Sequence, residues 1–331
     1  MKELVKKLTE TYGPSGFEGQ VRELIAAEIK GLADEVRTDA LGNLFALKKG
    51  KDSSKKALVA AHMDEIGIMV THVDKNGFLR FTRIGGIRPL GLPGVRVVFG
   101  NGVTGGIGVE KLDDRAKVPD LDKMYIDVGA LDKASSPVQV GDAGAFFQPF
   151  VAQQGRWIAK AFDDRIGCAI LIETLRKLKK PQHDVYFVFT AQEEVGVRGA
   201  RVAAFAVDPD FAIAIDITVA ADTPECPPAA MELGKGPAIK VMDNGMVVHP
   251  GMKNWMVKTA EDAGIPYQFE VLEHGSTDAM AIQTAREGVP SGVLSVPTRY
   301  AHTGCEMLDE SDVQNTVRLL VELLSRQVEL A

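Results

Sequence analysis

A glycine-rich segment in the first half of the chain places the strongest constraint on the fold. Nine glycines fall between residues 85 and 108, and short β-branched runs such as Val95–Phe99 and Val103–Val109 lie among them. Helical periodicity is nearly absent from about residue 66 to about residue 150. Many short strands with glycine turns indicate a small β sandwich or barrel. We therefore predict a β-rich, barrel-like domain at residues 66–152, inserted into a second domain.

The sequence on either side of this segment has a different pattern. A strand-like run occurs at Ala57–Ala61, and after Trp157 helices and strands alternate, beginning with a helix predicted at Ile166–Leu178. Alternating β and α elements are typical of an α/β sandwich. We predict that residues 1–65 and 153–331 form a three-layer α/β/α domain. At 331 residues the chain is long enough for about two domains without disulfide support.

Two predicted helix starts resemble capping boxes. Ser15 is followed by Glu18 just ahead of a helix that includes Val21, and Ser311 is followed by Gln314 at the start of the last helix. Each pair would satisfy free backbone N–H groups in the first turn of its helix.

Composition and charge exclude several classes of protein. The formal net charge is −7, which gives no electrostatic footprint for nucleic acid. No run approaches the ~18 apolar residues of a membrane span, and the N-terminus lacks the apolar centre of a signal peptide. Cys168, Cys226 and Cys305 are far apart and odd in number, which argues against a disulfide framework or a thiolate zinc site. We expect a cytoplasmic protein with no nucleic-acid or membrane partner.

Polar side chains follow the predicted strands at the points where those strands end. The run Ala57–Ala61 leads into His62, and Asp64 lies two residues further on, so both side chains point the same way along an extended chain. Asp64 can then hold the second ring nitrogen of His62, as is common for metal-bound histidines. The alternative is a strand-end histidine that only caps a turn.

Two aspartates stand at similar junctions. Asp163 precedes the predicted helix Ile166–Leu178, where the alternative role is acidic N-capping. Asp216 ends the predicted strand Phe211–Ile215, where the alternative is an Asx turn. An apolar strand that is buried on both faces and ends in a carboxylate indicates a site residue.

Two adjacent glutamates and a second histidine complete the set. Glu193 and Glu194 follow the apolar strand Asp184–Thr190. Because adjacent side chains diverge, one could ligate a metal while the other takes a proton from water. The alternative is acidic enrichment in the first turn of a helix. His302 follows the last predicted strand, and a lone histidine there would more often be structural.

As a set, these side chains indicate a metal centre. Imidazole nitrogens and carboxylate oxygens without thiolates suit Zn²⁺, Co²⁺ or Mn²⁺. One carboxylate can bridge two ions held ~3.5–4 Å apart. In open α/β sheets, ligands bind beyond the carboxyl ends of the strands, which is where these residues are predicted to lie.

The chain resembles the M42 family of metallo-aminopeptidases, which includes glutamyl aminopeptidases, deblocking aminopeptidases and the tetrahedral TET peptidases, with some members labelled endoglucanases. The resemblance runs over nearly the whole chain. It is specific because six motifs occur in the family's order: AHMDEIG at Ala61–Gly67, AFDDRIG at Ala161–Gly167, QEEVGVRGA at Gln192–Ala200, LGKGP at Leu233–Pro237, GSTDA at Gly275–Ala279 and RYAHTGCEM at Arg299–Met307. The residues after His302 differ from the family's usual motif, but no ligand is lost.

The resemblance implies a role for each matched residue. Glu193 matches the catalytic glutamate, which activates a metal-bridged water, and Asp64 matches the carboxylate that orients a metal-bound histidine. The metal ligands of the family match, in chain order, His62, Asp163, Glu194, Asp216 and His302.

Within that ligand set, Asp163 corresponds to the bridging carboxylate. The resemblance favours His62 with Asp216 on one ion and Glu194 with His302 on the other. Related two-metal peptidases also imply a cis peptide bond between Asp163 and the following Asp164.

The family function is hydrolysis of N-terminal residues from peptides, with two divalent metal ions per subunit, Zn²⁺ or Co²⁺ and also Mn²⁺. Family members assemble through the inserted domain into dimers that build a hollow tetrahedral dodecamer, so we expect a homo-oligomer. Two alternatives remain, a metal-dependent hydrolase of another bond such as a β-glucan, and a metal-binding scaffold without activity. Glycosidases use two carboxylates without paired metals, which argues against the first. A retained Glu193, which matches no ligand, argues against the second.

Overall fold

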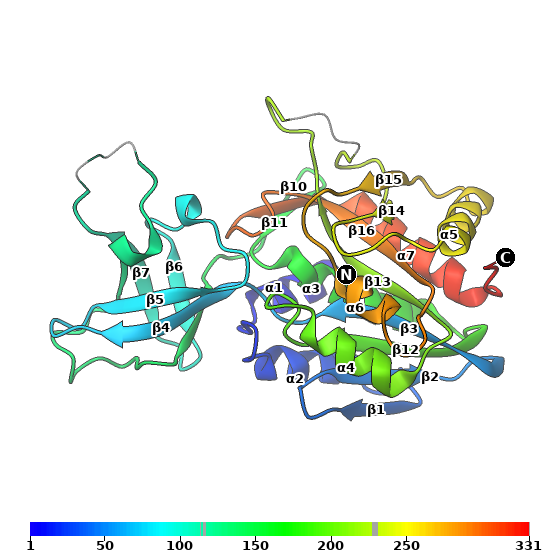
Figure 1. Ribbon diagram of the computed structural model, residues 1–331, viewed down its shortest axis with the longest axis horizontal. Coiled ribbons are helices and arrows are strands. Elements are labelled where there is room, and N and C mark those ends of the chain that lie inside the picture. Colours follow the sequence, from blue (N-terminus) through cyan, green and yellow to red (C-terminus); the bar gives the residue numbers. More distant parts are fainter. Residues whose placement is uncertain (113, 115–116, 227–230, 331) are drawn as a thin grey trace.

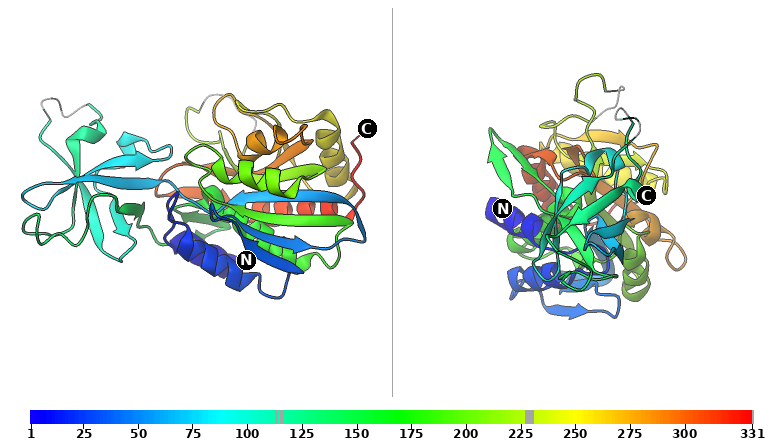
Figure 2. Two further views of the ribbon diagram at one scale, coloured as in Figure 1. Left: turned by 60° about the horizontal axis from the view of Figure 1, so that its bottom comes forward. Right: turned by 90° about the vertical axis from the view of Figure 1, so that its left-hand side faces the viewer.

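The computed structural model describes residues 1–112, 114, 117–226 and 231–330 and has two lobes (Figure 1). The larger lobe is a mixed α/β sandwich and the smaller one is a closed β-barrel, which confirms the predicted fold class. The barrel stands out from one end of the sandwich, and the C-terminus lies at the opposite end (Figures 1 and 2).

An eleven-stranded sheet forms the middle layer of the larger lobe. Its main path runs through β1 (Glu35–Thr38), β2 (Leu44–Lys48), β12 (His183–Thr190), β3 (Asp52–His62), β13 (Phe211–Val219), β16 (Ser291–Arg299), β17 (Glu306–Asp309), β11 (Arg156–Ala159) and β10 (Val151–Gln153). Off this path, β14 (Ala238–Met242) pairs with β16 and with β15 (Gln268–Val271). Strands β12, β3, β13 and β16 are parallel, so their carboxyl ends meet at one edge of the sheet.

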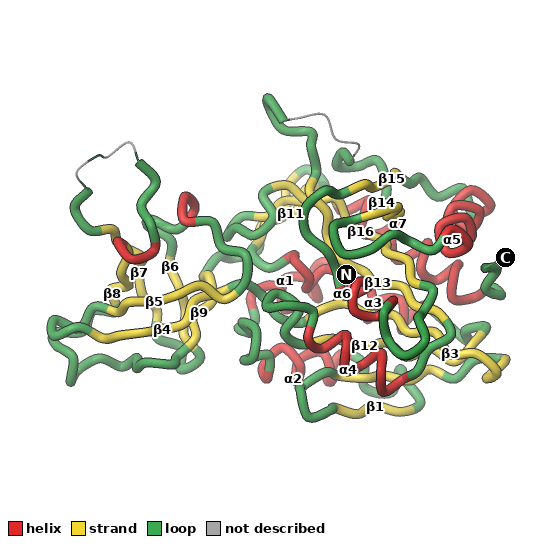
Figure 3. Tube along the Cα trace, in the orientation of Figure 1, coloured by secondary structure: helices red, strands yellow, loops and turns green. Residues whose placement is uncertain are grey.

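Helices cover both faces of this sheet (Figure 3). One face carries α1 (Lys2–Glu10), α2 (Gly19–Glu28), α3 (Phe162–Lys177), α5 (Pro250–Asp262) and α7 (Glu310–Ser325), and the other carries α4 (Arg198–Val207) and α6 (Asp278–Gln283). The pleat of β3 explains the double core, because Val59 and Ala61 pack toward the first group of helices whereas Leu58 and Ala60 pack toward the second. Within the described residues, no helix has the length and apolar character needed to cross a bilayer.

Six antiparallel strands close the barrel in the order β4-β5-β8-β7-β6-β9. They are β4 (Gly67–Val73), β5 (Leu79–Ile84), β6 (Arg96–Phe99), β7 (Thr104–Val109), β8 (Met124–Asp127) and β9 (Ala143–Phe146), with short 3-10 turns η1 (Pro89–Gly91) and η2 (Leu121–Lys123) between them. The barrel has its own core, which includes Ile68, Phe81 and Phe99. All six strands fall inside the predicted insert, and the boundaries at residues 66 and 152 stay a prediction.

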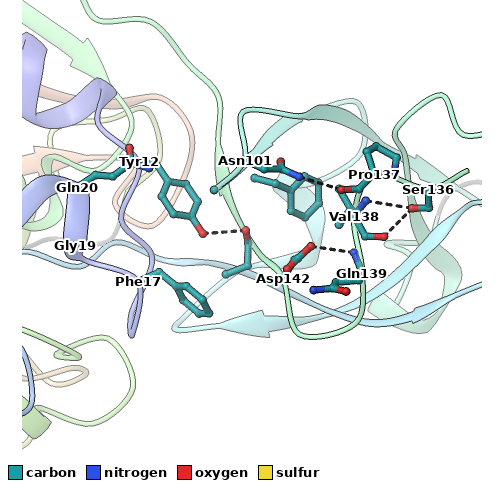
Figure 4. A pocket seen from close by; sticks show the side chains of 13 residues that line it. Tyr12, Phe17, Gly19, Gln20, Asn101, Ser136, Pro137, Val138, Gln139 and Asp142 are labelled. Carbon is teal, nitrogen blue, oxygen red and sulfur yellow. Dashed lines mark hydrogen bonds between the residues drawn. The ribbon is translucent and has the colours of Figure 1, made fainter.

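A groove of about 760 Å³ lies at the neck between the two lobes (Figure 4). Tyr12 and Phe17 of the N-terminal segment line one wall, and Asn101 and Asp142 of the barrel line the other. The Tyr12 hydroxyl donates a hydrogen bond of 3.0 Å to the carbonyl of Ala143. The N-terminal segment is therefore tied to the barrel as well as to the sandwich.

Neither predicted capping box forms. Glu18 accepts hydrogen bonds from the backbone N–H groups of Gly16 and Gln192, which lie outside α2. At α7 the capping carboxylate is Asp309, which accepts a bond of 2.7 Å from the backbone N–H of Ser311. In the first case the donors to Glu18, and in the second the acceptor Asp309, are not the residues that the predicted boxes require.

Candidate metal centre

The predicted site residues converge at the edge where the parallel strands end. His62 is the last residue of β3, and it pairs in register with Thr190, the last residue of β12. Glu193 and Glu194 follow β12, and His302 follows β16. Because the four central strands are parallel, side chains far apart in the sequence meet at this edge.

Asp163 lies between the two histidines. Its Oδ1 is 3.0 Å from Nε2 of His62, and its Oδ2 is 3.1 Å from Nε2 of His302. The peptide bond between Asp163 and Asp164 is cis, as the family resemblance implies. Asp164 accepts bonds from the backbone N–H groups of His62 at 3.1 Å and of Gly167 at 3.0 Å. The N-capping alternative thus describes Asp164, whereas Asp163 faces both histidines.

Glu193 and Glu194 approach different histidines. They lie in the turn between β12 and α4, and α4 begins only at Arg198, so they are not in the first turn of a helix. Oε2 of Glu193 is 4.0 Å from Nε2 of His62, and Oε2 of Glu194 is 3.5 Å from Nε2 of His302. Their side chains are only 12% and 5% exposed. The two adjacent carboxylates can therefore do different work in one buried site.

Asp216 departs from its predicted place at the end of a strand. β13 continues to Val219 because its partner β16 also continues and keeps the ladder intact. Asp216 is buried within the strand. One of its carboxylate oxygens lies within 4.8 Å of possible ligand atoms of His62 and Asp164. Fully buried Lys240 lies close enough to act on its charge, and Lys240 is itself paired with Asp243 at 3.0 Å and Glu270 at 3.1 Å.

Asp64 holds more of the site than the sequence predicts. The ring Nδ1 of His62 is 3.2 Å from the Asp64 carbonyl oxygen, which can only accept, and 3.4 Å from Oδ1 of the Asp64 carboxylate. The same carboxylate accepts bonds from the backbone N–H groups of Glu193 at 3.0 Å and Glu194 at 3.1 Å, and from the Ser15 hydroxyl at 2.6 Å. Asp64 therefore turns Nε2 of His62 toward Asp163 and also fixes the turn that carries both glutamates.

Sequence reasoning missed a further carboxylate, Glu306. This residue of β17 is 1% exposed. Its Oε2 accepts a bond of 3.1 Å from the backbone N–H of Asp163, and its Oε1 accepts one of 3.0 Å from the backbone N–H of His302. The only sequence signal was its place inside the motif RYAHTGCEM, because its contacts are with backbone groups.

The crowded carboxylates alter one another's protonation. Burial and the nearby charge of Asp163 raise the pKa of Glu194 to about 8, and they also raise the pKa of Asp216 to about 8. Burial raises the pKa of Glu193 well above its ordinary value. Burial acts to lower the pKa of His302, but its bond to Asp163 and the charge of Glu194 raise that pKa to about 10. Without cations, protonated carboxyl groups and the positive imidazolium of His302 therefore limit the negative charge of the site. Bound cations would balance that charge instead.

The donor set fits divalent cations. Two groups of side chains place one possible ligand atom each within 4.8 Å of one another, namely His62 with Asp164 and Asp216, and His62 with Asp163 and Glu194. Two ligands about 2.1 Å from a tetrahedral ion lie roughly 3.4 Å apart. The separations of 3.0, 3.1 and 3.5 Å among the histidine and carboxylate atoms are close to that value.

Comparison with known proteins identifies relatives over nearly the whole chain. Residues 42–319 match the family described as M42 glutamyl aminopeptidase. The lysyl aminopeptidase of Pyrococcus furiosus is 40% identical over 338 aligned positions, which cover 97% of this chain and 96% of the relative.

Solved structures agree with this result. The aminopeptidase APDkam598 from the archaeon Desulfurococcus kamchatkensis superposes with a TM-score of 0.94 at 39% identity, covering 98% of this chain and 94% of that one. The TET1 peptidase of Pyrococcus horikoshii superposes with a TM-score of 0.89 at 34% identity, covering 98% and 99%. That peptidase can assemble into a tetrahedron or a large octahedral shell.

Proposed function

This chain belongs to the M42 family of glutamyl aminopeptidases and is a peptide hydrolase, and from that premise we propose that it removes N-terminal residues from peptides at the centre around Asp163. One observation carries the proposal. The two oxygens of Asp163 face the Nε2 atoms of two different histidines, His62 and His302. A carboxylate placed in this way can be shared between two cations.

The chain would hold two divalent ions per subunit, with Zn²⁺, Co²⁺ or Mn²⁺ as candidates. We assign His62 and Asp216 to one ion, Glu194 and His302 to the other, and Asp163 to both. Bound ions of this kind polarise a substrate carbonyl and lower the pKa of water.

Glu193 is the proposed general base. It stands in the same buried space as the ligands, and the assignment gives it no place on either ion. Its backbone is fixed through the bond to Asp64. The Glu193 carboxylate would take a proton from the attacking water and return it to the nitrogen of the leaving peptide. This role requires the ionised carboxylate, which cations beside it would favour.

The acidic surroundings also suit the free end of a peptide. Asp163, Glu193, Glu194 and Asp216 bring several negative charges together, and the positive α-amine of a substrate complements them. A blocked N-terminus would lose this attraction. We therefore expect cleavage only at chain ends, and N-acetylated peptides should resist hydrolysis.

A substitution at Glu193 tests the proposal. In Glu193→Gln, turnover of aminoacyl chromogenic amides should fall by about 10²–10⁴-fold, while two ions per chain stay bound, as measured by mass spectrometry of the metal after dialysis. The matched control is Glu23→Gln on the exposed side of α2, which should change neither quantity. Near-normal turnover in Glu193→Gln would exclude this residue as the base. A cellulose derivative belongs in the same panel, and metal-independent cleavage of it would overturn the proposed reaction.

We also propose that the chain forms a homo-oligomer through the inserted domain at residues 66–152. The Pyrococcus horikoshii relative forms closed shells. Large apolar side chains stand exposed on the insert, including Leu131 at 90% and Leu90 at 74%, and removing apolar surface of this kind from water is favourable. Light scattering should give a mass well above that of one chain. A monomer at all concentrations would contradict the proposal.

A further inference from the structure

The inserted barrel reaches into the metal centre of its own chain. The residues directly after β5, Gly85 and Gly86, lie against side chains of the sandwich. The Gly86 carbonyl oxygen is 3.1 Å from Nδ1 of His302. A carbonyl can only accept, so Nδ1 is the donor, and Nε2 is the nitrogen that faces Asp163.

Both glycines leave no room for a side chain on this wall. A Cβ atom on Gly86 would lie 2.5 Å from Nδ1 and 2.7 Å from Cε1 of His302, and its three nearest neighbours all belong to that ring. A Cβ atom on Gly85 would lie 3.0 Å from Oε2 of Glu194 and 2.8 Å from Cγ2 of Ile66. The pair thus touches the two residues that we assign to one ion, Glu194 and His302.

We propose that Gly85 and Gly86 are positioning residues for the Glu194–His302 half of the metal centre. Gly86 fixes the tautomer and tilt of the His302 ring through its carbonyl, and the absence of side chains lets the barrel approach both ligands. The inserted domain then has a role in the site of its own subunit that is separate from any role in assembly. This inference rests on the proposed function, because it assumes that His302 holds a cation.

Gly86→Ala is a selective probe. The backbone of Gly86, unlike that of Gly85, does not have the left-handed conformation that strains a side chain. The three atoms nearest to the new methyl group all belong to the His302 ring. We expect affinity for one ion per chain to fall by about 10–100-fold while the other ion stays bound. Equilibrium dialysis with Co²⁺ followed by metal analysis measures this, and the Co²⁺ absorption spectrum should lose the component of the weakened site.

Gly106→Ala is the matched control. Gly106 lies in β7 of the same barrel, its backbone is not left-handed, and a Cβ atom there has no neighbour within 4 Å among the described residues. This variant should bind both ions as the unchanged protein does. If Gly86→Ala also bound both ions with unchanged affinity, the inference would be wrong.

A double substitution separates ring positioning from general damage to the barrel. If Gly86→Ala acts through His302, adding it to His302→Ala should change neither the affinity of the remaining ion nor the melting temperature. Should Gly86→Ala alone fail to fold, folding of the double variant supports the inference, and failure of both contradicts it. If the unchanged protein bound fewer than two ions, the proposed function would itself be wrong, which distinguishes that failure from this one.

Discussion

The two histidines of the centre are held in opposite ways. His62 ends β3, a strand paired on both sides, and it is 2% exposed. His302 lies in a turn with a left-handed backbone, φ 61°, and its side chain is 33% exposed. Asp64, the partner of His62, is two residues away. Glu306 is four residues from His302, but Gly86 reaches the His302 ring from the barrel, far away in the chain. The ring of His62 is therefore held by a local partner, whereas the ring of His302 depends on a contact with a distant part of the chain, the barrel.

Asp163 joins these halves, so its loss should have the largest effect. Asp163→Asn keeps the shape of the side chain but removes its charge and one oxygen. Both ions should bind more weakly, and kcat/KM should fall at least about 10³-fold, since bound metal supplies several kcal/mol of transition-state stabilisation.

The control for Asp163→Asn is Asp312→Asn. Asp312 is also a buried carboxylate whose oxygens accept backbone bonds, from Gly234 and Gly236 at 2.7 Å each, but these partners are not among the predicted ligands. Metal content should stay at two ions in this control. Weakening of only one ion by Asp163→Asn would show that the two halves are independent.

Asp64 sets the local half, and its substitution should come next in size. Asp64→Asn cannot accept the full set of bonds from Glu193, Glu194 and Ser15, so we expect a loss of about 10–100-fold in affinity for the ion held by His62. Ser15→Ala removes one of these bonds, worth about 1.5–3 kcal/mol to a charged acceptor, and it leaves the others in place. Its loss should therefore be smaller. A larger effect on the His302 ion than on the His62 ion would reverse the comparison.

The contrast between the two halves of the centre explains which of its features could be predicted from the sequence. The strand-end position of His62 and the spacing to Asp64 follow from the period of an extended chain, so local pattern was enough. The barrel was predictable because glycines and β-branched runs dominate that segment. Asp216 was placed at a strand end because the pairing of β13 with the rest of β16 is a long-range property.

Other contacts in the site could not be predicted from local sequence patterns. Glu306 holds Asp163 and His302 through their backbone N–H groups, and Gly86 acts through its carbonyl and its missing side chain. Ser15 was predicted as a helix cap, and its true partner, Asp64, is distant in the chain. Groups that position a site through the backbone can be of many residue types, so single-sequence patterns do not reveal them.

Glu306→Gln should weaken metal binding in the half of the centre that contains His302, by less than Asp64→Asn weakens the other half. Glutamine keeps one acceptor oxygen and presents an N–H donor to the other backbone N–H, so one of the two bonds to Asp163 and His302 is lost. We expect about a tenfold loss in affinity for the His302 ion and a smaller loss for the other ion, which shares Asp163. The measurement is Co²⁺ dialysis, again with Asp312→Asn as the control. Equal weakening of both ions would indicate that Glu306 supports the whole centre rather than one half.

The smallest expected effect is a dependence of stability on pH. Without cations, Glu194 and Asp216 have pKa values of about 8, above those of the unfolded chain, so they favour the folded state when protonated. The stability that they contribute is lost as pH rises from about 4 through about 8. His302, with a pKa of about 10, loses its contribution as pH rises further, from about 6.5 through about 10.

All three shifts have the same sign, so metal-stripped protein should melt at least about 4 °C lower at pH 9 than at pH 6. Cation binding requires deprotonated ligands, so added Zn²⁺ should stabilise the protein more at pH 9 than at pH 6. Thermal melts with and without metal measure both trends. His302→Ala should reduce the change above pH 8 in stripped protein, because it removes one of the groups that lose their protons there. If the melting temperature of the stripped protein rose over this range, the pKa values of Glu194, Asp216 and His302 would not be raised in the folded state as described.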